Sequence, residues 1–290
     1  MEERKSAVTG ADPAPGGAEA PLRGTPDGAG RSGCGEVSIR DLSNFLLDFS
    51  TTLMTAGVHT SRVVRNVTRI AASFGYEVEM TVFQKHITMS VLHGSDDTIR
   101  RTSVRKIEPG PFNFNTISQL SSLSWAAHDR HLPLPELRRR YEAVVAEPRL
   151  SRWWVLLLVS LANAAFCRLF GGDPAAMGLV FAATLAGFFV RQETTRRGMN
   201  HMAVFFLCSF IASMIAALGI WYGLGDTPQI ALGTSVLFLI PGVPLINAII
   251  DTLEGHVLVG FSRAVNACIL IICIALGLSA TLLIVGVGIL

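Results

Sequence analysis

Charged residues are scarce in the second half of this 290-residue chain. Residues 1–150 hold 18 of the 24 Lys and Arg and 17 of the 22 Asp and Glu, which leaves 6 and 5 for residues 151–290. Half of all residues are hydrophobic and the mean hydropathy is +0.45, which is too apolar for an ordinary soluble protein. The sequence therefore predicts a soluble first half and a membrane-embedded second half.

Motifs for nucleotides, metals and nucleic acids are also missing. The chain has no P-loop, GxGxxG or GxSxG and no visible nucleophile–base pair, so we expect neither an enzyme nor a bound cofactor. The five cysteines form no CxxC pair, and no two histidines form an HxxxH pair beside a carboxylate, so we expect no metal site. The net charge of +2 gives no basic excess for binding nucleic acid.

Five windows in the second half are long and apolar enough to cross about 30 Å of hydrocarbon, which takes about 20 helical residues. The loop after the second window carries Arg191, Arg196 and Arg197, whereas the loops on the opposite side carry no Lys or Arg. The positive-inside rule then predicts a cytoplasmic N-terminus and an external C-terminus. The stretch 254–262 is interpreted as a re-entrant or interfacial piece. The predicted spans are 153–170, 175–190, 203–221, 230–250 and 264–288.

Residues 37–148 are predicted to form one small cytoplasmic α/β domain, after a disordered Gly/Ala/Pro-rich tail at 1–36. Apolar residues recur at three- and four-residue spacing over 37–57, which is typical of an amphipathic helix. Gly57 suits the end of that helix, and Thr60 or Ser61 suits the start of a second helix that ends near Gly75. Three segments of alternating apolar and polar residues follow, at 77–83, 86–92 and 98–105, and we expect them to form an antiparallel meander. Two further helices are expected at 114–130 and 134–146.

A helix break is predicted inside the fourth window. Pro241, Gly242 and Pro244 interrupt an apolar run, and inside a membrane the backbone groups freed there must be satisfied by protein, water or a ligand. Broken helices of this kind form the substrate sites of secondary transporters. The helix that resumes after Pro244 would offer free N–H groups and a positive dipole end to a carboxylate.

Polar residues after the break are functional candidates, because ionisable groups inside a membrane are costly. At helical spacing Asn247, Asp251 and Glu254 fall on one face of the resumed helix. Asn247 can hydrogen-bond a substrate, and Asp251 can bind a proton or an ammonium group. The alternative for Asp251 and Glu254 is an ordinary cytoplasmic loop, because a straight span would end near Ile250.

Three further polar residues lie in or near the spans. Arg263 and Asn266 open the last span and are candidates for substrate contact, although a positive-inside anchor is the favoured interpretation of Arg263. Asn163 lies midway along the first span, where an unpaired amide would be costly. We therefore expect it to face the interior, toward either a substrate or another helix.

Four segments carry a resemblance to a known family. They are residues 239–248 (LIPGVPLINA) with Asp251, Phe170 to Asp173 (FGGD), Phe49 to Gly57 continuing through Arg62, and Pro109-Gly110. Through them the chain resembles the bacterial threonine/serine exporter family over about residues 37–287. The resemblance implies a proton-driven exporter of threonine and serine or, in two-component members, of dicarboxylates such as succinate. Long members have ten spans whereas five are predicted here. The resemblance therefore implies a first-half subunit in the bacterial inner membrane, working with a small second membrane subunit or as a homo-oligomer.

Two functions of different classes fit the residues. The first is a secondary exporter, or one subunit of it, for an amino acid or a dicarboxylate. The second is a non-transporting membrane scaffold or sensor, whose cytoplasmic domain binds a metabolite or a partner. A pure anchor needs neither a broken helix nor Asn163 and Asn247 inside the membrane. The sequence therefore favours export.

Overall fold

The computed structural model describes residues 37–94 and 96–286, which belong to a single compact unit. The predicted tail at 1–36, which includes Cys34, lies outside the described residues. So do the last two positions of the predicted fifth span.

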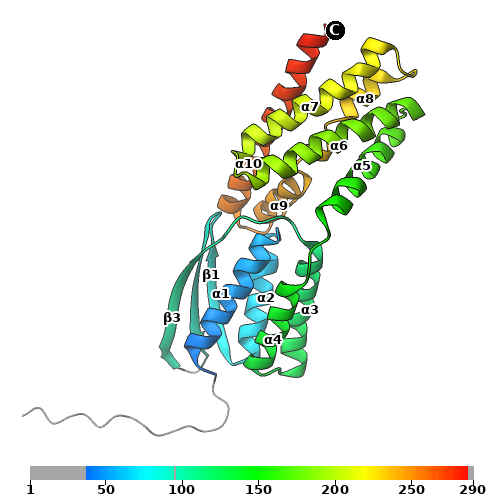
Figure 1. Cartoon of the computed structure of the whole chain (residues 1–290). Helices are drawn as coiled ribbons and strands as arrows, with labels where there is room; N and C mark the ends of the chain where they lie inside the picture. The colour runs from blue at the N-terminus through cyan, green and yellow to red at the C-terminus, as the bar shows by residue number, and fades with distance from the viewer. Residues whose placement is uncertain (1–36, 95, 287–290) are drawn as a thin grey trace, which may run out of the picture. The chain divides into compact units, whose positions relative to one another are not determined.

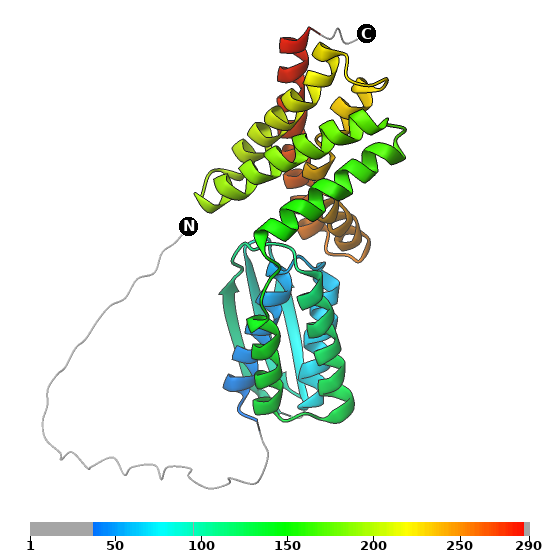
Figure 2. The same cartoon turned by 45° about the vertical axis from the view of Figure 1, so that its right-hand side comes forward.

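The N-terminal half contains a small three-stranded sheet and four helices (Figures 1 and 2). The strands pair antiparallel in the order β1–β2–β3, which confirms the predicted meander. Helices α1 and α2 pack on the sheet, and α3 and α4 pack on those helices. The elements are α1 (Ile39–Thr55), α2 (Thr60–Ser73), β1 (Tyr76–Val82), β2 (His86–His93), β3 (Asp96–Lys106), α3 (Phe114–Arg130) and α4 (Leu134–Ala146).

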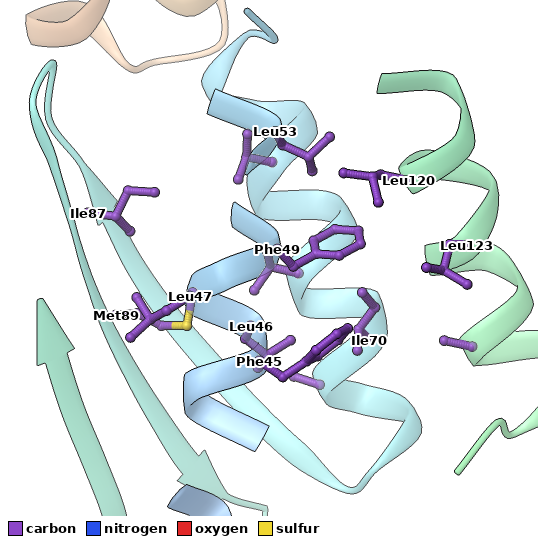
Figure 3. Packing of buried hydrophobic residues seen from close by; sticks show 14 of the residues in the cluster. Phe45, Leu46, Leu47, Phe49, Leu53, Ile70, Ile87, Met89, Leu120 and Leu123 are labelled. Carbon is purple, nitrogen blue, oxygen red and sulfur yellow. The ribbon is translucent and has the colours of Figure 1, made fainter. Parts of the chain in front are cut away.

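Large apolar side chains fill the core of this half (Figure 3). Phe45 and Phe49 of α1 lie beside Ile70 of α2, and Ile87 and Met89 of β2 lie on the side of the sheet that faces α1. None of these side chains is more than 1% exposed. Burying each contributes about 1.5–3 kcal/mol, so this apolar core stabilises the N-terminal half.

The connection between α1 and α2 is tightly held. Gly57 adopts φ +93, and a Cβ there would overlap the ring of Phe112. Its N–H donates to the Met54 carbonyl. The C-cap residue of α1 is Ala56, and Gly57, predicted for that position, follows it with a positive φ. The prediction that Thr60 or Ser61 caps α2 is wrong. The N-cap residue is His59, whose side chain makes no capping bond, and Thr60 is the first helical residue.

The C-terminal half is helical. Four helices, α5, α6, α7 and α10, are long and apolar enough to cross a membrane, and the bent pair Pro228–Leu239 and Gly242–Leu253 brings the number to five if it is one span. These positions agree with the five predicted windows. The elements are α5 (Arg152–Leu169), α6 (Pro174–Arg196), α7 (His201–Tyr222), α8 (Pro228–Thr234), η1 (Leu237–Leu239), α9 (Gly242–Leu253) and α10 (Val257–Val285).

Two span boundaries differ from the prediction. Helix α6 continues past the apolar window to Arg196, because polar residues can extend a helix beyond hydrocarbon. Residues 257–262 are helical and continuous with the last span, since α10 begins at Val257 and runs without interruption to Val285. Its first turns pack closely on α9, where a Cβ at Gly260 would lie 2.7 Å from the Ala248 carbonyl oxygen.

Small residues, rather than large ones, fill the helix contacts of this half. Ala212 and Ala216 of α7 are fully buried, whereas Leu258 and Leu283 of α10 are about 80% exposed (80% and 81%). A Cβ at Gly277 of α10 would lie 2.6 Å from the Phe206 carbonyl oxygen of α7. This inverted pattern is typical of helices in lipid, where apolar side chains gain nothing by turning inward and close backbone packing holds the bundle together.

The FGGD turn between α5 and α6 has a structural role. One carboxylate oxygen of Asp173 accepts hydrogen bonds from the Ala176 N–H and the Thr227 hydroxyl, and the other accepts from the Asp226 N–H, each at 2.9 Å. Asp173 therefore caps α6. It also ties the α5–α6 turn to the turn that precedes α8.

Candidate functional site

The predicted helix break is confirmed. The two helical pieces on either side of Ile240 and Pro241 are bent by 58°. The Gly242 N–H donates to the Ile240 carbonyl at 2.9 Å, and Pro244 has no N–H. Two of the first three residues of α9 therefore offer no free donor. The predicted capture of a carboxylate by this helix end consequently finds little support.

Asp251 is fully buried and joins three helices. Its Oδ1 accepts a hydrogen bond from the Thr60 N–H at 2.7 Å, and its Oδ2 lies 2.9 Å from Nη1 of Arg263 on α10. Helix α2 has no acidic residue in its first turn and no capping side chain of its own. Asp251 supplies that cap from 191 positions further along the chain. Because α9 continues to Leu253, Asp251 is not in a loop, and that alternative is wrong.

Arg263 is held from two sides. Its Nη2 donates to the Val58 carbonyl at 3.2 Å, and its side chain is 15% exposed. Nη1 approaches Asp251 closely enough for an ion pair but not along the direction of a hydrogen bond, and it has no other hydrogen-bond partner among the described residues. The charge of Arg263 is therefore balanced while one of its donor groups is unused. It is more than a loop anchor.

Asn247 lies one turn before Asp251 on the same face of α9, as predicted. Its Nδ2 donates to the Gly57 carbonyl at 2.7 Å, and the residue is 8% exposed. The amide thus contacts the same connection, between α1 and α2, that Arg263 and Asp251 contact. Three candidate residues from the C-terminal half therefore converge on four consecutive residues, 57–60, of the N-terminal half.

Glu254 does not share this buried position. It follows the last residue of α9, is exposed, and forms an ion pair with Arg65 of α2 at 3.2 Å. The nearby Ser61 hydroxyl and then Arg65 hold the pKa of Glu254 below its ordinary value, although Ser61 lies outside hydrogen-bond geometry. Burial lowers the pKa of neighbouring His59, an effect that the charge of Glu254 partly offsets. The expected common face fails at Glu254 because the helix ends before it.

A cavity of about 260 Å³ lies beside these contacts. Four sequence candidates from the C-terminal half line it, namely Pro244, Asn247, Arg263 and Asn266. The N-terminal half contributes the rest of the wall, which includes Gly57, Gln84, Glu108, Pro109, Gly110 and Phe112. Sequence analysis did not name this second wall as part of a site. Gly57 and Pro109-Gly110, however, are among the residues that carry the family resemblance.

A second cavity, of about 320 Å³, lies on the other side of the break and is lined almost wholly by apolar residues such as Phe166, Leu237 and Ile240. Asn163 is its polar residue. The Asn163 amide donates to the Thr184 hydroxyl at 2.6 Å and to the Thr234 carbonyl at 3.2 Å. As expected, Asn163 faces the interior, where these bonds join α5 to α6 and α8.

Pro241 and Gly242 form the break itself. Pro241 is buried, and Gly242 is open enough that a Cβ would meet nothing within 4 Å. Within residues 37–94 and 96–286, no group of three or more His, Cys, Asp or Glu side chains is arranged to hold a metal ion. The polar side chains that line the cavity beside Arg263 include this guanidinium, the carboxylate of Glu108 and the amides of Gln84, Asn247 and Asn266.

Comparison with known proteins identifies the family. The family described as "Putative threonine/serine exporter" matches residues 44–285, which include both halves and every candidate residue above. The chain belongs to this exporter family. This membership, together with the helices that are long and apolar enough to cross a membrane, identifies the chain as a multi-pass membrane protein.

Two relatives match most of the length of this chain. A protein of Klebsiella aerogenes is 30% identical over 229 residues, which are 78% of this chain and 86% of the relative. A protein of Escherichia coli K12 is 28% identical over 237 residues, which are 81% and 91% of the two chains. Each is named "Probable succinate transporter subunit YjjP". No solved structure matches the chain.

Proposed function

We propose that this chain is one subunit of a secondary exporter, driven by the proton gradient, for a small metabolite that carries a carboxylate. Threonine, serine and dicarboxylates such as succinate are the candidate substrates. The family description supports the amino acids, and the names of the two relatives support succinate. The word "subunit" in those names also supports a second membrane component.

The cavity beside Arg263 is the observation that carries this proposal. Four residues chosen from the sequence line it, and Arg263 brings a guanidinium, the side chain best suited to a carboxylate. The amides of Asn247 and Asn266 add neutral groups that can bond a carboxylate, a hydroxyl or an ammonium. One cation already balanced by Asp251 suits a small polar substrate rather than a large anion.

Asp251 is the proposed proton-linked group. It is fully buried, and it is paired with Arg263, a residue of the cavity wall. A proton on Asp251 would remove the counter-charge of Arg263 and so change the groups that face a substrate. We further propose that residues 37–148 form a cytoplasmic domain and that the C-terminus lies outside, as the loop charges favour.

Everted membrane vesicles test the proposal directly. Vesicles that contain this chain and its second membrane subunit are acidified inside and supplied with labelled serine, threonine or succinate. At least one of the three compounds is expected to accumulate, and accumulation is expected to stop when the pH gradient is collapsed. Absence of uptake of all three compounds, with correct insertion verified, would refute export of these substrates.

Two matched carboxylate variants test the role of Asp251. Asp251→Asn is expected to abolish gradient-driven uptake while the protein still inserts, because the amide cannot bind the proton. Glu254→Gln, which changes an exposed carboxylate of the same segment outside the cavity, is expected to retain uptake. If Asp251→Asn retains as much uptake as Glu254→Gln retains, Asp251 has no role in the mechanism.

A further inference from the structure

We propose that the α1–α2 loop, residues 57–60, is an internal competitor for the carboxylate of the substrate. Its carbonyl oxygens occupy hydrogen-bond donors of the cavity wall, and the loop withdraws when a carboxylate takes those donors. The inference rests on the proposed function of the cavity. It assigns a role in substrate loading to the N-terminal half.

Two donors that would recognise a carboxylate are already occupied by this loop. Asn247 Nδ2 donates to the Gly57 carbonyl at 2.7 Å, and Arg263 Nη2 donates to the Val58 carbonyl at 3.2 Å. Two consecutive carbonyl oxygens thus accept bonds from an amide and a guanidinium, as a carboxylate would. Both side chains also line the cavity, so a substrate in the cavity would compete with the loop for the same groups.

Two further contacts hold the loop in place. The Thr60 N–H donates to Asp251 at 2.7 Å, and Arg65 pairs with Glu254 at 3.2 Å in an exposed position. The first contact is a charge-assisted hydrogen bond shielded from water. The second is open to water and contributes less. The Thr60–Asp251 hydrogen bond is therefore the stronger of these two contacts, and it can be removed without changing a residue that lines the cavity.

The docked loop leaves several polar atoms unsatisfied. Six buried side-chain atoms among the described residues have no hydrogen-bond partner, and four of them lie at this contact. They are Thr60 Oγ1, Ser61 Oγ, Asp251 Oδ2 and Arg263 Nη1. Asp251 Oδ2 and Arg263 Nη1 are ion-paired with each other but share no hydrogen bond, whereas the two hydroxyls have no hydrogen-bond partner among the described residues. A permanent interface would be expected to satisfy such hydroxyls, because each one left unpaired destabilises the contact. Their concentration here favours a contact that opens during the working cycle.

Thr60→Pro is the variant that tests the role of the Thr60–Asp251 hydrogen bond. Thr60 is the first residue of α2, where proline is well tolerated and its missing N–H costs the helix nothing. His59 has φ −74 and ψ 152, a conformation that is allowed before proline. The substitution therefore removes the hydrogen bond to Asp251 and leaves Asp251, Asn247 and Arg263 in place. Thr60→Val is the matched control, because it keeps the N–H and the shape of the side chain.

Binding of labelled succinate, serine and threonine is measured on the full-length chain and both variants, each purified in complex with the second membrane subunit. Thr60→Pro is expected to bind the recognised compound about tenfold more tightly than Thr60→Val, since one charge-assisted hydrogen bond no longer favours the docked loop. In the unmodified chain, the same compound is expected to accelerate amide hydrogen exchange in residues 57–61. Exchange in the core strand β2 is expected to stay unchanged. The exchange experiment needs no variant, so it holds even if Thr60→Pro folds poorly.

The outcomes separate this inference from the proposed function. If a compound binds equally well to both variants and exchange in 57–61 is unchanged or slower, the loop is a fixed wall. The inference then falls while the substrate site stands. If none of the three compounds binds to any of the proteins, the proposed substrate site falls and the inference with it.

Discussion

Two polar contacts of the helical half, one at Asn163 and one at Asp251, differ in charge and in the segments that they join. Asn163 is neutral, and its amide donates to a hydroxyl and a carbonyl on neighbouring helices. Asp251 is charged, and it joins α9 to an arginine of α10 and to the first turn of α2. The first contact lies wholly within the C-terminal half, whereas the second connects it to the N-terminal half.

We interpret this difference as one between a structural contact at Asn163 and a functional contact at Asp251. Neutral hydrogen bonds hold helices together in lipid at small cost, as also seen where Ser213 and Thr281 join α7 to α10 at 2.6 Å. A buried ion pair is a poor choice for stability alone, since two charges must leave water and apolar residues would often serve as well. We therefore interpret the Asp251 contact as retained for function.

Removing one member of the charged pair is expected to have the largest effect. Asp251→Ala leaves the guanidinium of Arg263 buried without its counter-charge, which lowers the free energy of unfolding by about 3–5 kcal/mol. Unfolding of the purified chain in detergent, followed by tryptophan fluorescence, measures this loss. The double variant Asp251→Leu with Arg263→Met should recover most of the stability, but no transport. A single variant as stable as the unmodified chain would contradict the importance of the pair.

Straightening the broken helix is the next largest change. Proline inside a helix costs about 3 kcal/mol, so replacing Pro241 and Pro244 with alanine favours a continuous helix across the 58° bend. Distances between spin labels on α8 and α9 should lengthen, and uptake into everted vesicles should be lost. Full uptake by a variant with a straightened helix would contradict a role of the break in transport. A scaffold or sensor, which does not transport, would keep its binding of a metabolite or partner in the same variant.

The neutral contact between α7 and α10 is expected to depend on close packing. Gly277→Ala places a Cβ 2.6 Å from the Phe206 carbonyl oxygen, which should destabilise the chain by about 1–3 kcal/mol. Gly178→Ala in α6 is the control, because a Cβ there meets nothing within 4 Å. Thermal unfolding in detergent compares the two variants. Equal midpoints would show that packing at Gly277 is not limiting.

Asn163→Ala is expected to have the smallest effect. It removes two interhelical hydrogen bonds, and such bonds contribute on average about 0.6 kcal/mol each in membrane proteins. The unfolding midpoint should fall slightly and uptake should persist. Loss of uptake in a stable Asn163→Ala variant would mean that the neutral contact also belongs to the transport path, and the comparison with Asp251 would fail.

The amino-acid sequence predicts the fold well where the signal is local. The spans follow from apolar length, the helix break from Pro241 and Pro244, and the end of α1 from Gly57. The start of α10 was not predicted in the same way, because Gly255, Gly260 and Arg263 interrupt the apolar run, whereas the helix begins at Val257 and packs on α9. Glu254 was placed on the buried face by periodicity, which fails where the helix ends one residue earlier.

The candidate site could be predicted only in part, since it forms between segments far apart in the chain. Asn247, Arg263 and Asn266 were accessible to sequence analysis because polar groups near apolar spans stand out. Gln84 and Glu108 are ordinary loop residues in the sequence, and nothing local predicts that they line the same cavity. The pairing of Asp251 with the Thr60 N–H likewise depends on how α2 and α9 meet.

The central claim is that the cavity beside Arg263, rather than the contact at Asn163, binds the substrate. The most direct measurement is uptake of labelled serine, threonine and succinate into everted vesicles that carry Asn247→Ala or Asn163→Ala, each made with the second membrane subunit and matched for insertion. Asn247→Ala is expected to lower uptake about tenfold or more, through loss of a hydrogen bond to a charged group, while Asn163→Ala retains it. Full uptake by Asn247→Ala, or an equal loss in both variants, would contradict the account.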